Sequence, residues 1–519
     1  MGAKAKVMNK QGLMNTIKEY LSLSEFESVI FDNQKIEISD AVLRRVKRSF
    51  NFLNEFSKNK VIYGVNTGFG PMAQYRIKDE DRIQLQYNLI RSHSSGTGKP
   101  IEPQAVKAAI LARLNTMALG YSGVHPSLIH LMTELINRDI TPLIFEHGGV
   151  GASGDLVQLA HLALVLIGEG EVFYKGERRP TKEVFEIEGL EPIQVEIREG
   201  LALMNGTSVM TGIGVVNVHK ANKLLDWSLK ISCAINEIVR AYDDHLSFEL
   251  NNVKLHDGQR QVAEKMRGNL ADSQLIRKRE DHLYTGENTE DVFSEKVQEY
   301  YSLRCIPQIL GPVKETIDSV AAILEKEFNS ANDNPIIDVE NRHVFHGGNF
   351  HGDYISLEMD KLKIVIAKLT MLAERQLNYL LNAKINELLP PFVNLGTLGF
   401  NFGMQGVQFT ATSTTAESQM LSNPMYVHSI PNNNDNQDIV SMGTNSAVIA
   451  SKVIENAFEV LAIELITVVQ AIDYMGQKDS VSSVTKKMYD DIRAIIPTFK
   501  QDQVMYPFVQ KVKEHLINN

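Results

Sequence analysis

Residues 147–155 read His-Gly-Gly-Val-Gly-Ala-Ser-Gly-Asp, so four glycines fall within seven positions. The residues that follow are apolar at helical spacing, which predicts a helix from Leu156 to Gly168. Glycine adopts backbone conformations that are closed to other residues and lets two backbones approach closely. We therefore expect a tightly bent turn that leads directly into the N-terminus of a helix.

The centre of this turn has an unusual chemical option. If Ala152-Ser153-Gly154 bends until the Gly154 nitrogen reaches the Ala152 carbonyl carbon, a five-membered ring closes. Loss of water at the carbonyl and at the Ser153 side chain would leave a methylidene-imidazolone, an electrophile that the positive end of the following helix would favour. On residue types alone, the simpler interpretation is a structural turn in which Ser153 or Asp155 caps that helix. A serine-hydrolase elbow fits poorly, because Asp155 stands where the second glycine of Gly-x-Ser-x-Gly is needed.

The composition of the chain is that of an ordinary globular protein. Hydrophobic residues make up 43% of the 519 residues and the formal net charge is −10, which argues against a nucleic-acid surface. Cys233 and Cys305 are far apart, and the group His346, His351 and Asp353 matches no strong ligand motif, so we expect no metal. The N-terminus lacks a signal-peptide pattern and no apolar run of about 20 residues occurs, so we expect a cytoplasmic protein without a membrane span.

Long segments of apolar periodicity dominate the second half of the chain, at residues 209–246, 311–327, 354–388 and 446–474. They predict a mainly α fold built on a long parallel helical bundle. Shorter helices are expected earlier, among them one at 41–56 that is capped by Ser39-Asp40. The pattern of residues 171–200, including Val184-Phe185-Glu186-Ile187, predicts a small strand insert. We divide the chain into an N-terminal region, 1–205, which carries the glycine turn and a mobile loop around Tyr63, and a long-helix body, 206–519.

Polar, glycine-rich segments lie between these helices, although long helices need no such inserts to pack. Taken in order, they resemble segments of the aromatic amino acid ammonia-lyase family, which includes histidine, phenylalanine and tyrosine ammonia-lyases. The resemblance covers nearly the whole chain, implies an ammonia-lyase/fumarase-like fold, and has its most specific match in the Ala-Ser-Gly turn. The other matching segments are the Tyr63 loop, residues 88–98, Met204-Asn205-Gly206, residues 301–304, Asn334-Pro335, residues 347–351 and Asn436-Gln437-Asp438.

The resemblance implies a role for each matching residue. Ala152, Ser153 and Gly154 would form the 4-methylidene-imidazol-5-one ring without a metal or a dissociable cofactor. Asn205 resembles the asparagine that supports ring formation, and Arg304 the arginine whose planar fork binds the substrate carboxylate. Tyr63 resembles the catalytic base and Tyr301 a second tyrosine beside the ring. The residues that resemble substrate-binding positions are Gly70, His93, Phe350, Asn433, Asn436 and Gln437.

Two further expectations follow from the family. Its members are homotetramers whose active sites draw residues from three chains, so we expect the partners of this chain to be copies of itself. A tyrosine can act as a base only if its pKa falls well below the usual value of about 10. We therefore expect positive charge or a helix dipole to lower the pKa of Tyr63.

The choice of substrate depends on two positions. Histidine ammonia-lyases resemble this chain at Ser92-His93, but they carry a glutamate where Gln437 stands, whereas Asn436-Gln437-Asp438 resembles the phenylalanine and tyrosine enzymes. In tyrosine-using relatives a histidine in the region of His93 binds the phenol hydroxyl, and buried polar groups discriminate strongly. We expect deamination of L-tyrosine to p-coumarate and ammonia, with phenylalanine a poorer substrate. Histidine ammonia-lyase and aminomutase activity remain alternatives, and the intact site residues argue against a non-catalytic helical scaffold.

Overall fold

The computed structural model describes residues 15–17, 20–286, 291–293 and 295–519. The chain packs into two compact units, and each unit is made of three segments. The first unit contains residues 1–217, 321–360 and 424–448, and the second contains residues 218–320, 361–423 and 449–519. The expected division at residue 205 differs from these units, because several long helices begin in one unit and end in the other.

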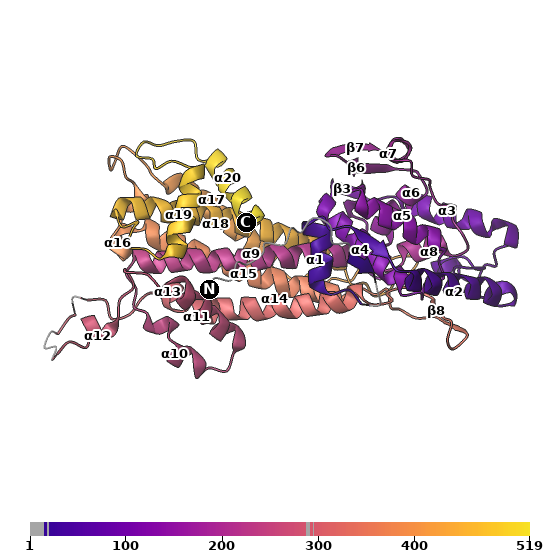
Figure 1. The fold of residues 1–519 in the computed structure, drawn as a ribbon, viewed down its shortest axis with the longest axis horizontal. Helices are drawn as coiled ribbons and strands as arrows, with labels where there is room; N and C mark the ends of the chain where they lie inside the picture. The colour runs from indigo at the N-terminus through magenta and orange to yellow at the C-terminus, as the bar shows by residue number, and fades with distance from the viewer. Residues whose placement is uncertain (1–14, 18–19, 287–290, 294) are drawn as a thin grey trace, which may run out of the picture. The chain divides into compact units, whose positions relative to one another are not determined.

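The helices of the first unit are short or of medium length and bury one or more apolar faces (Figure 1). Ser39 accepts a hydrogen bond from the Val42 N–H and caps α2, as its sequence predicts. Helix α4 is buried on all sides, with Arg113 among its fully buried side chains. These helices are α1 (Leu23–Phe31), α2 (Asp40–Phe56), α3 (Arg82–His93), α4 (Pro103–Ala118), α5 (Pro126–Asn137), α6 (Leu156–Leu166), α7 (Thr181–Glu188) and α8 (Glu199–Met204).

Small sheets accompany these helices, and the expected strand insert is only partly strand. Strands β4 (Thr141–Pro142), β6 (Glu171–Tyr174) and β7 (Glu177–Pro180) form an antiparallel sheet. Residues 184–187, however, lie in α7, because Val184 and Phe185 are buried while Ile187 faces solvent, and Gly189 ends the helix in the left-handed region. The remaining pairs are β1 (Asn15–Ile17) with β2 (Ile36–Ile38), β3 (Thr97–Pro100) with β5 (Phe145–His147), and β8 (Ile336–Asp338) with β9 (His343–Phe345).

Four long helices confirm the predicted bundle: α9 (Ser208–Ile238), α14 (Ile306–Phe328), α15 (Asp353–Leu381) and α18 (Gly443–Met475). In the first unit, the Asn217 side chain of α9 donates to the Ala447 carbonyl of α18 at 2.9 Å. A Cβ on Gly214 of α9 would lie 2.7 Å from a methyl group of Leu324 in α14, so glycine allows these two helices to approach closely. In the second unit, Ser232 of α9 donates to Gln376 of α15 at 3.1 Å.

The second unit is otherwise built from shorter helices. Helices make up 59% of the structure and strands 8%, which confirms the mainly α class. Within the described part of the chain, no helix is both long enough and apolar enough to cross a membrane. The shorter helices are α10 (Phe248–Asn252), α11 (Asp257–Asn269), α12 (Arg279–His282), α13 (Tyr301–Arg304), α16 (Ala383–Asn386), α17 (Gln405–Leu421), α19 (Ser483–Ile495) and α20 (Tyr506–Asn518).

Candidate active site

The glycine turn is bent as its sequence predicts and leads into α6. Gly151 and Gly154 both have left-handed backbone conformations, with φ of 75° and 71°. A Cβ on Gly154 would lie 1.9 Å from the Gly206 carbonyl oxygen, so no other residue fits there without a backbone shift. The same Gly206 carbonyl accepts a hydrogen bond from the Asp155 N–H at 2.7 Å. Segments 151–155 and 205–206 are therefore packed backbone against backbone.

The sequence suggests that Asp155 caps the helix that follows the turn, but in the structure its side chain has a different role. Its carboxylate does not cap α6; it accepts hydrogen bonds from the Val209 and Met210 N–H groups, at 2.8 and 3.0 Å, and from the Thr444 hydroxyl. Asp155 thus caps α9, which begins more than 50 residues later. Burial raises the pKa of Asp155 to about 6, although these three donors oppose the shift.

Two side chains from distant segments converge on Ser153. The Asn205 amide donates to the Ser153 carbonyl at 3.1 Å, and the Gln437 amide donates to the Ser153 hydroxyl at 2.9 Å. Asn205 and Gln437 are buried, while Ser153 is partly exposed between buried neighbours Ala152 and Gly154. The structure therefore holds the central serine at both its backbone and its side chain.

The loop that carries Gln437 is unusually strained. Asn433, Asn434 and Asp435 all have positive φ, between 52° and 59°, a region in which asparagine and aspartate are tolerated best among residues with a side chain. Backbone hydrogen bonds between Asn432 and Gln437 close the loop in both directions, at 3.2 and 3.3 Å. Strain of this kind persists only where the surroundings fix the conformation, and it is common at functional sites.

Tyr63 is bound to its own loop. Its hydroxyl accepts a hydrogen bond from the Gly70 N–H at 3.0 Å, and its backbone N–H donates to His346 Nε2 at 3.3 Å. Burial raises the pKa of Tyr63, and the Gly70 N–H opposes this only in part. The expected lowering of this pKa is therefore wrong for the described chain, because desolvation outweighs the only favourable contact.

Tyr63, Ser153 and the segments around them line a cavity of about 450 Å³, a volume within the range of small-molecule sites. Of the residues expected to bind substrate, Gly70, His93, Asn433, Asn436 and Gln437 lie along it, together with Tyr63, Ser153 and Asn205. Phe350 is not among the lining residues; it lies two positions before Gly352, whose N–H donates to the Gly151 carbonyl at 3.1 Å. The wall also contains residues to which the sequence assigned no role in the site: Phe69, Pro71, Met72, Leu85, Leu156, Leu201 and Asn434; Asn88, Leu89 and Ser92, from the matching segment 88–98, line it as well.

His93 has a defined hydrogen-bond partner on its own helix. Its Nδ1 lies 3.0 Å from both the Leu89 carbonyl oxygen and the Ser92 hydroxyl. When Nδ1 donates to the Leu89 carbonyl, which can only accept, Nε2 of the neutral ring is an acceptor. Leu85, Leu89 and His93 recur at intervals of four residues, and this periodicity could have identified α3 as one wall of the cavity.

Comparison with known proteins identifies the family of this chain. The family model described as aromatic amino acid lyase matches residues 21–494. The chain belongs to the aromatic amino acid lyase family. It is 38% identical to a histidine ammonia-lyase of Geobacillus sp. (strain WCH70) over 501 residues, which cover 96% of this chain and 95% of that protein.

Solved structures of lyase relatives have the same fold. The crystal structure of a tyrosine aminomutase from Streptomyces globisporus is 34% identical, covers 97% of each chain, and has a TM-score of 0.93. A phenylalanine aminomutase of Pantoea agglomerans is 32% identical, with a TM-score of 0.93 over 98% of this chain and 99% of its own. This aromatic amino acid lyase is therefore a carbon–nitrogen lyase with the predicted ammonia-lyase fold.

Two expected site residues of this lyase, Tyr301 and Arg304, belong to the second unit. Both lie in α13, where the Arg304 guanidinium carbon is 4.7 Å from the centre of the Tyr301 ring, a cation–π contact. The Tyr301 side chain is 70% exposed. Arg279 holds the preceding segment by donating to the Val297 carbonyl at 2.6 Å and pairing with Asp244. Neither Tyr301 nor Arg304 is among the residues that line the first-unit cavity.

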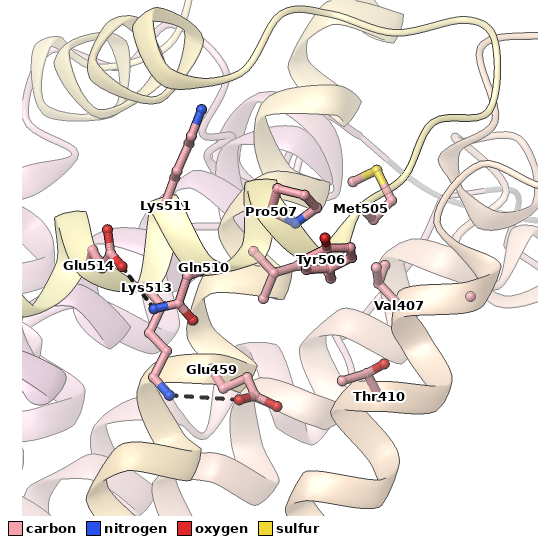
Figure 2. A pocket seen from close by; sticks show the side chains of 12 residues that line it. Val407, Thr410, Glu459, Met505, Tyr506, Pro507, Gln510, Lys511, Lys513 and Glu514 are labelled. Carbon is pink, nitrogen blue, oxygen red and sulfur yellow. Dashed lines mark hydrogen bonds and ion pairs between the residues drawn. The ribbon is translucent and has the colours of Figure 1, made fainter.

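The second unit of the lyase contains a larger cavity, of about 870 Å³, between α17, α18 and α20 (Figure 2). Four of its charged and polar side chains form two pairs: Lys513 lies 3.7 Å from Glu459, and Gln510 donates to Glu514 at 2.8 Å. None of the expected site residues lines it. Within the described ranges, no group of three or more histidine, cysteine, aspartate or glutamate side chains is arranged to hold a metal ion.

Proposed function

We propose that this lyase deaminates L-tyrosine to p-coumarate and ammonia, using a 4-methylidene-imidazol-5-one ring formed from Ala152-Ser153-Gly154. The pair of hydrogen bonds on Ser153 carries the proposal, because it fixes the residue whose hydroxyl would be lost as water and whose carbonyl would remain as part of the ring. Gly154 has the backbone freedom that ring closure needs. The ring supplies an electrophile that captures the substrate and turns a poor leaving group into a better one.

The residues around the ring have separate tasks in this proposal. Asn205 holds the Ser153 segment, and Gln437 closes the opposite side of the cavity with a neutral amide. Tyr63 removes the proton from the β-carbon of the substrate, which requires its pKa to fall once the site is complete. A guanidinium beside the phenol would have this effect, because positive charge favours the phenolate.

The guanidinium beside Tyr63 has to come from a residue that does not line the cavity. Among the described residues that line the cavity there is no lysine and no arginine, yet an amino acid substrate brings a carboxylate. Arg304 of α13 is the expected carboxylate ligand, and the exposed Tyr301 lies directly beside it. We propose that the protein is a homotetramer in which another copy supplies these two residues to the site.

His93 supports tyrosine over phenylalanine and histidine. With its Nδ1 proton on the Leu89 carbonyl, Nε2 is an acceptor for a phenol hydroxyl. Phenylalanine has no such hydroxyl, so the partly buried acceptor would stay unpaired. Histidine ammonia-lyase activity is the second candidate because the relative from Geobacillus carries that name, and the uncharged Gln437 argues against it.

The test is direct incubation of the purified protein with L-tyrosine, L-phenylalanine and L-histidine in turn. The ultraviolet absorbance of coumarate, cinnamate and urocanate follows each reaction. The fastest release should be of coumarate; fastest release of urocanate would replace the proposal with the histidine enzyme. Chiral analysis of the amino acids that remain would reveal a β-amino acid if the protein is an aminomutase, as its solved neighbours are named.

A further inference from the structure

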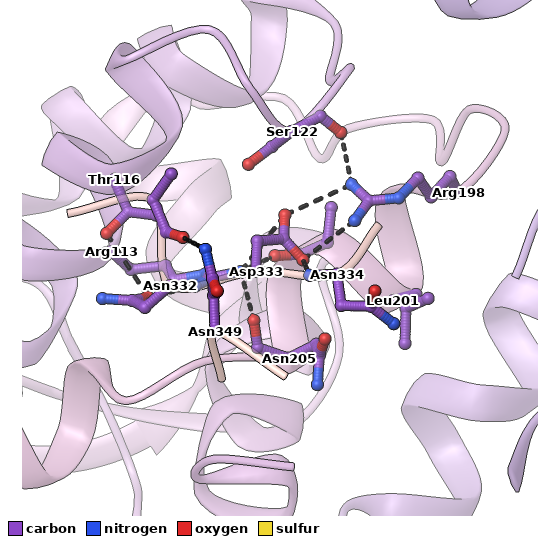
Figure 3. A network of polar contacts seen from close by, with 12 residues as sticks. Arg113, Thr116, Ser122, Arg198, Leu201, Asn205, Asn332, Asp333, Asn334 and Asn349 are labelled. Atoms are coloured by element: carbon purple, nitrogen blue, oxygen red, sulfur yellow. Dashed lines mark hydrogen bonds and ion pairs between the residues drawn. The ribbon is translucent and has the colours of Figure 1, made fainter. Parts of the chain in front are cut away.

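A buried arginine lies behind the site, on the side away from the cavity. Arg113 of α4 is fully buried, and its guanidinium donates to the Asn205 carbonyl at 2.9 Å and to the Ala202 carbonyl. Its other terminal nitrogen donates to the Asn332 side chain at 3.1 Å. Figure 3 shows this cluster, with Arg113, Asn205, Asn332 and Asp333 drawn together. Arg113 does not line the cavity itself.

The two carbonyls that Arg113 binds end a short helix. Ala202 lies in the last turn of α8, and Asn205 is its C-terminal cap residue. Carbonyls at a helix C-terminus lack partners within the helix, and a cation there also complements the helix dipole. Arg113 therefore fixes the end of α8, and with it the backbone from which the Asn205 side chain reaches the Ser153 carbonyl.

A carboxylate shared by two arginines holds Arg113 in place. Asp333 accepts hydrogen bonds from Arg198 at 2.9 and 3.2 Å, and one of its oxygens lies 3.9 Å from Arg113. Arg198 in turn donates to the Pro335 carbonyl at 2.8 Å and to the Ser122 carbonyl. Burial lowers the pKa of Arg113 to about 10, which leaves the guanidinium charged at neutral pH.

The glycine at position 206 allows the Arg113 guanidinium to lie directly against the backbone next to Asn205. A Cβ on the next residue, Gly206, would lie 2.2 Å from the Arg113 guanidinium and 2.6 Å from the Asn332 carbonyl. Gly206 also carries the carbonyl that the Asp155 N–H binds. Displacement of the guanidinium would therefore move Asn205 and Gly206 together, and these two residues hold Ser153 and Asp155.

We propose that Arg113 is a positioning residue for formation of the prosthetic ring. It acts through Asn205: the guanidinium fixes the Asn205 backbone so that the Asn205 amide holds the Ser153 carbonyl in the geometry that ring closure needs. Three hydrogen bonds and an ion pair set the position of the guanidinium, and a lysine, with a single point of charge, cannot reproduce the fork. The inference rests on the proposed function, because it concerns the ring of the proposed reaction.

The experiment follows ring formation directly in the full-length chain. Wild type, Arg113→Gln, Arg113→Lys and Lys107→Met are synthesised in a cell-free system, and mass spectrometry of the intact chain records the loss of water with time. Lys107 is the matched control, because it is a buried cation of the same helix that binds Asn33 and Asp139 rather than a site residue. Circular dichroism and gel filtration establish folding and assembly of each variant.

We expect ring formation to be about 100-fold slower in Arg113→Gln and about 10-fold slower in Arg113→Lys, as displacements near 1 Å have such effects. Lys107→Met should form the ring at the wild-type rate. In the Arg113 variants kcat should fall in proportion to ring content while KM stays unchanged, because Arg113 does not line the cavity. A purely structural role would lower thermal stability without slowing ring formation.

A folded Arg113→Gln variant that loses water at the wild-type rate would overturn the positioning role. If that variant fails to fold, the rate of water loss in Arg113→Lys decides instead, since lysine keeps the positive charge and most of the aliphatic part of the side chain. Wild-type chains that never lose the water would instead overturn the proposed function itself. The two failures are therefore distinguished by the wild-type mass, which is measured first.

Discussion

Two cavities of the protein differ in how their polar groups are satisfied. The larger one, in the second unit, lies between α17, α18 and α20, and among its lining residues Lys513 pairs with Glu459 and Gln510 with Glu514 (Figure 2). In the smaller cavity of the first unit, polar groups from four separate segments meet around Ser153. There, Asn205 Oδ1 is buried and accepts no hydrogen bond from any described residue.

This difference distinguishes a cavity left by helix packing from a functional site. An unpaired buried acceptor costs free energy unless a further group binds it, and a strained loop such as residues 433–435 is maintained only by its surroundings. Neither feature is needed to enclose empty volume. Convergence of polar groups from separate segments, with one buried acceptor left unpaired among the described residues, rather than cavity size, therefore identifies the site, and each prediction below tests this contrast.

The largest effect is expected from Ser153→Ala. The variant retains the turn, since alanine occupies less space than serine, but it cannot form the methylidene group. We expect activity to fall by at least about 1000-fold, the scale of removing a covalent catalyst. Turnover of L-tyrosine is measured by coumarate absorbance, with the mass of the intact chain as a second readout.

A matched hydroxyl in the other cavity provides the control for Ser153. Thr410 lines the second-unit cavity, and Thr410→Val removes its hydroxyl with little change in volume. This variant should retain wild-type turnover. If Ser153→Ala retained normal turnover, the ring mechanism would be wrong, and the contrast between the two cavities would lose its chemical basis.

A smaller effect is expected from His93→Phe. Loss of the Nε2 acceptor removes the partner proposed for the phenol hydroxyl, while the phenyl ring keeps most of the volume. The ratio of kcat/KM for tyrosine over phenylalanine should fall about 10- to 100-fold, as expected for one buried hydrogen bond. An unchanged ratio, measured with both substrates, would show that His93 does not bind the phenol hydroxyl of tyrosine.

Local patterns predicted much of this molecule, because they depend on neighbours in sequence. The Ser39 cap, the helix after the glycine turn and the four long helices follow from spacing and capping residues. The helix at 181–188 was missed because a four-residue segment with three apolar residues fits a strand and a helix equally well. Tertiary burial decided between them.

The cavity itself was predictable only where resemblance supplied the partners. Asn205 and Gln437 were expected near Ser153, and they are bonded to it. The contacts of Asp155 with α9 and of Arg113 with Asn205 join residues far apart in the chain, and no local pattern encodes them. The predicted lowering of the Tyr63 pKa was wrong for the described chain for the same reason, since the burial that raises this pKa depends on the packed structure.

Asp155 allows a test through pH. Its pKa is about 6 in the folded protein against 3.8 for the ordinary group, so the folded state binds a proton more tightly than the unfolded state. The stability that this group contributes is therefore full below about pH 4 and is lost as pH rises through 6. Asp155→Asn should gain stability relative to wild type over that range, by about 3 kcal/mol at most.

Thermal unfolding of both proteins from pH 4 to pH 7 measures this difference. Asp139→Asn serves as the control, because Asp139 is an exposed carboxylate of the same unit. Its difference from wild type should stay constant across the range. A constant difference for Asp155→Asn as well would show that the buried carboxylate is as well solvated by its three donors as it would be in water.

The smallest effect is expected from Glu459→Gln in the second-unit cavity. The amide keeps the shape of the side chain but weakens its pairing with Lys513, which is also paired with Glu455 at 3.2 Å. Because partly exposed ion pairs contribute about 1 kcal/mol or less, stability should change little, and kcat/KM for tyrosine should stay within about 2-fold of wild type. A large loss of turnover in a folded, correctly assembled variant would contradict the contrast between the cavities, since it would make a self-paired cavity part of the catalytic machinery.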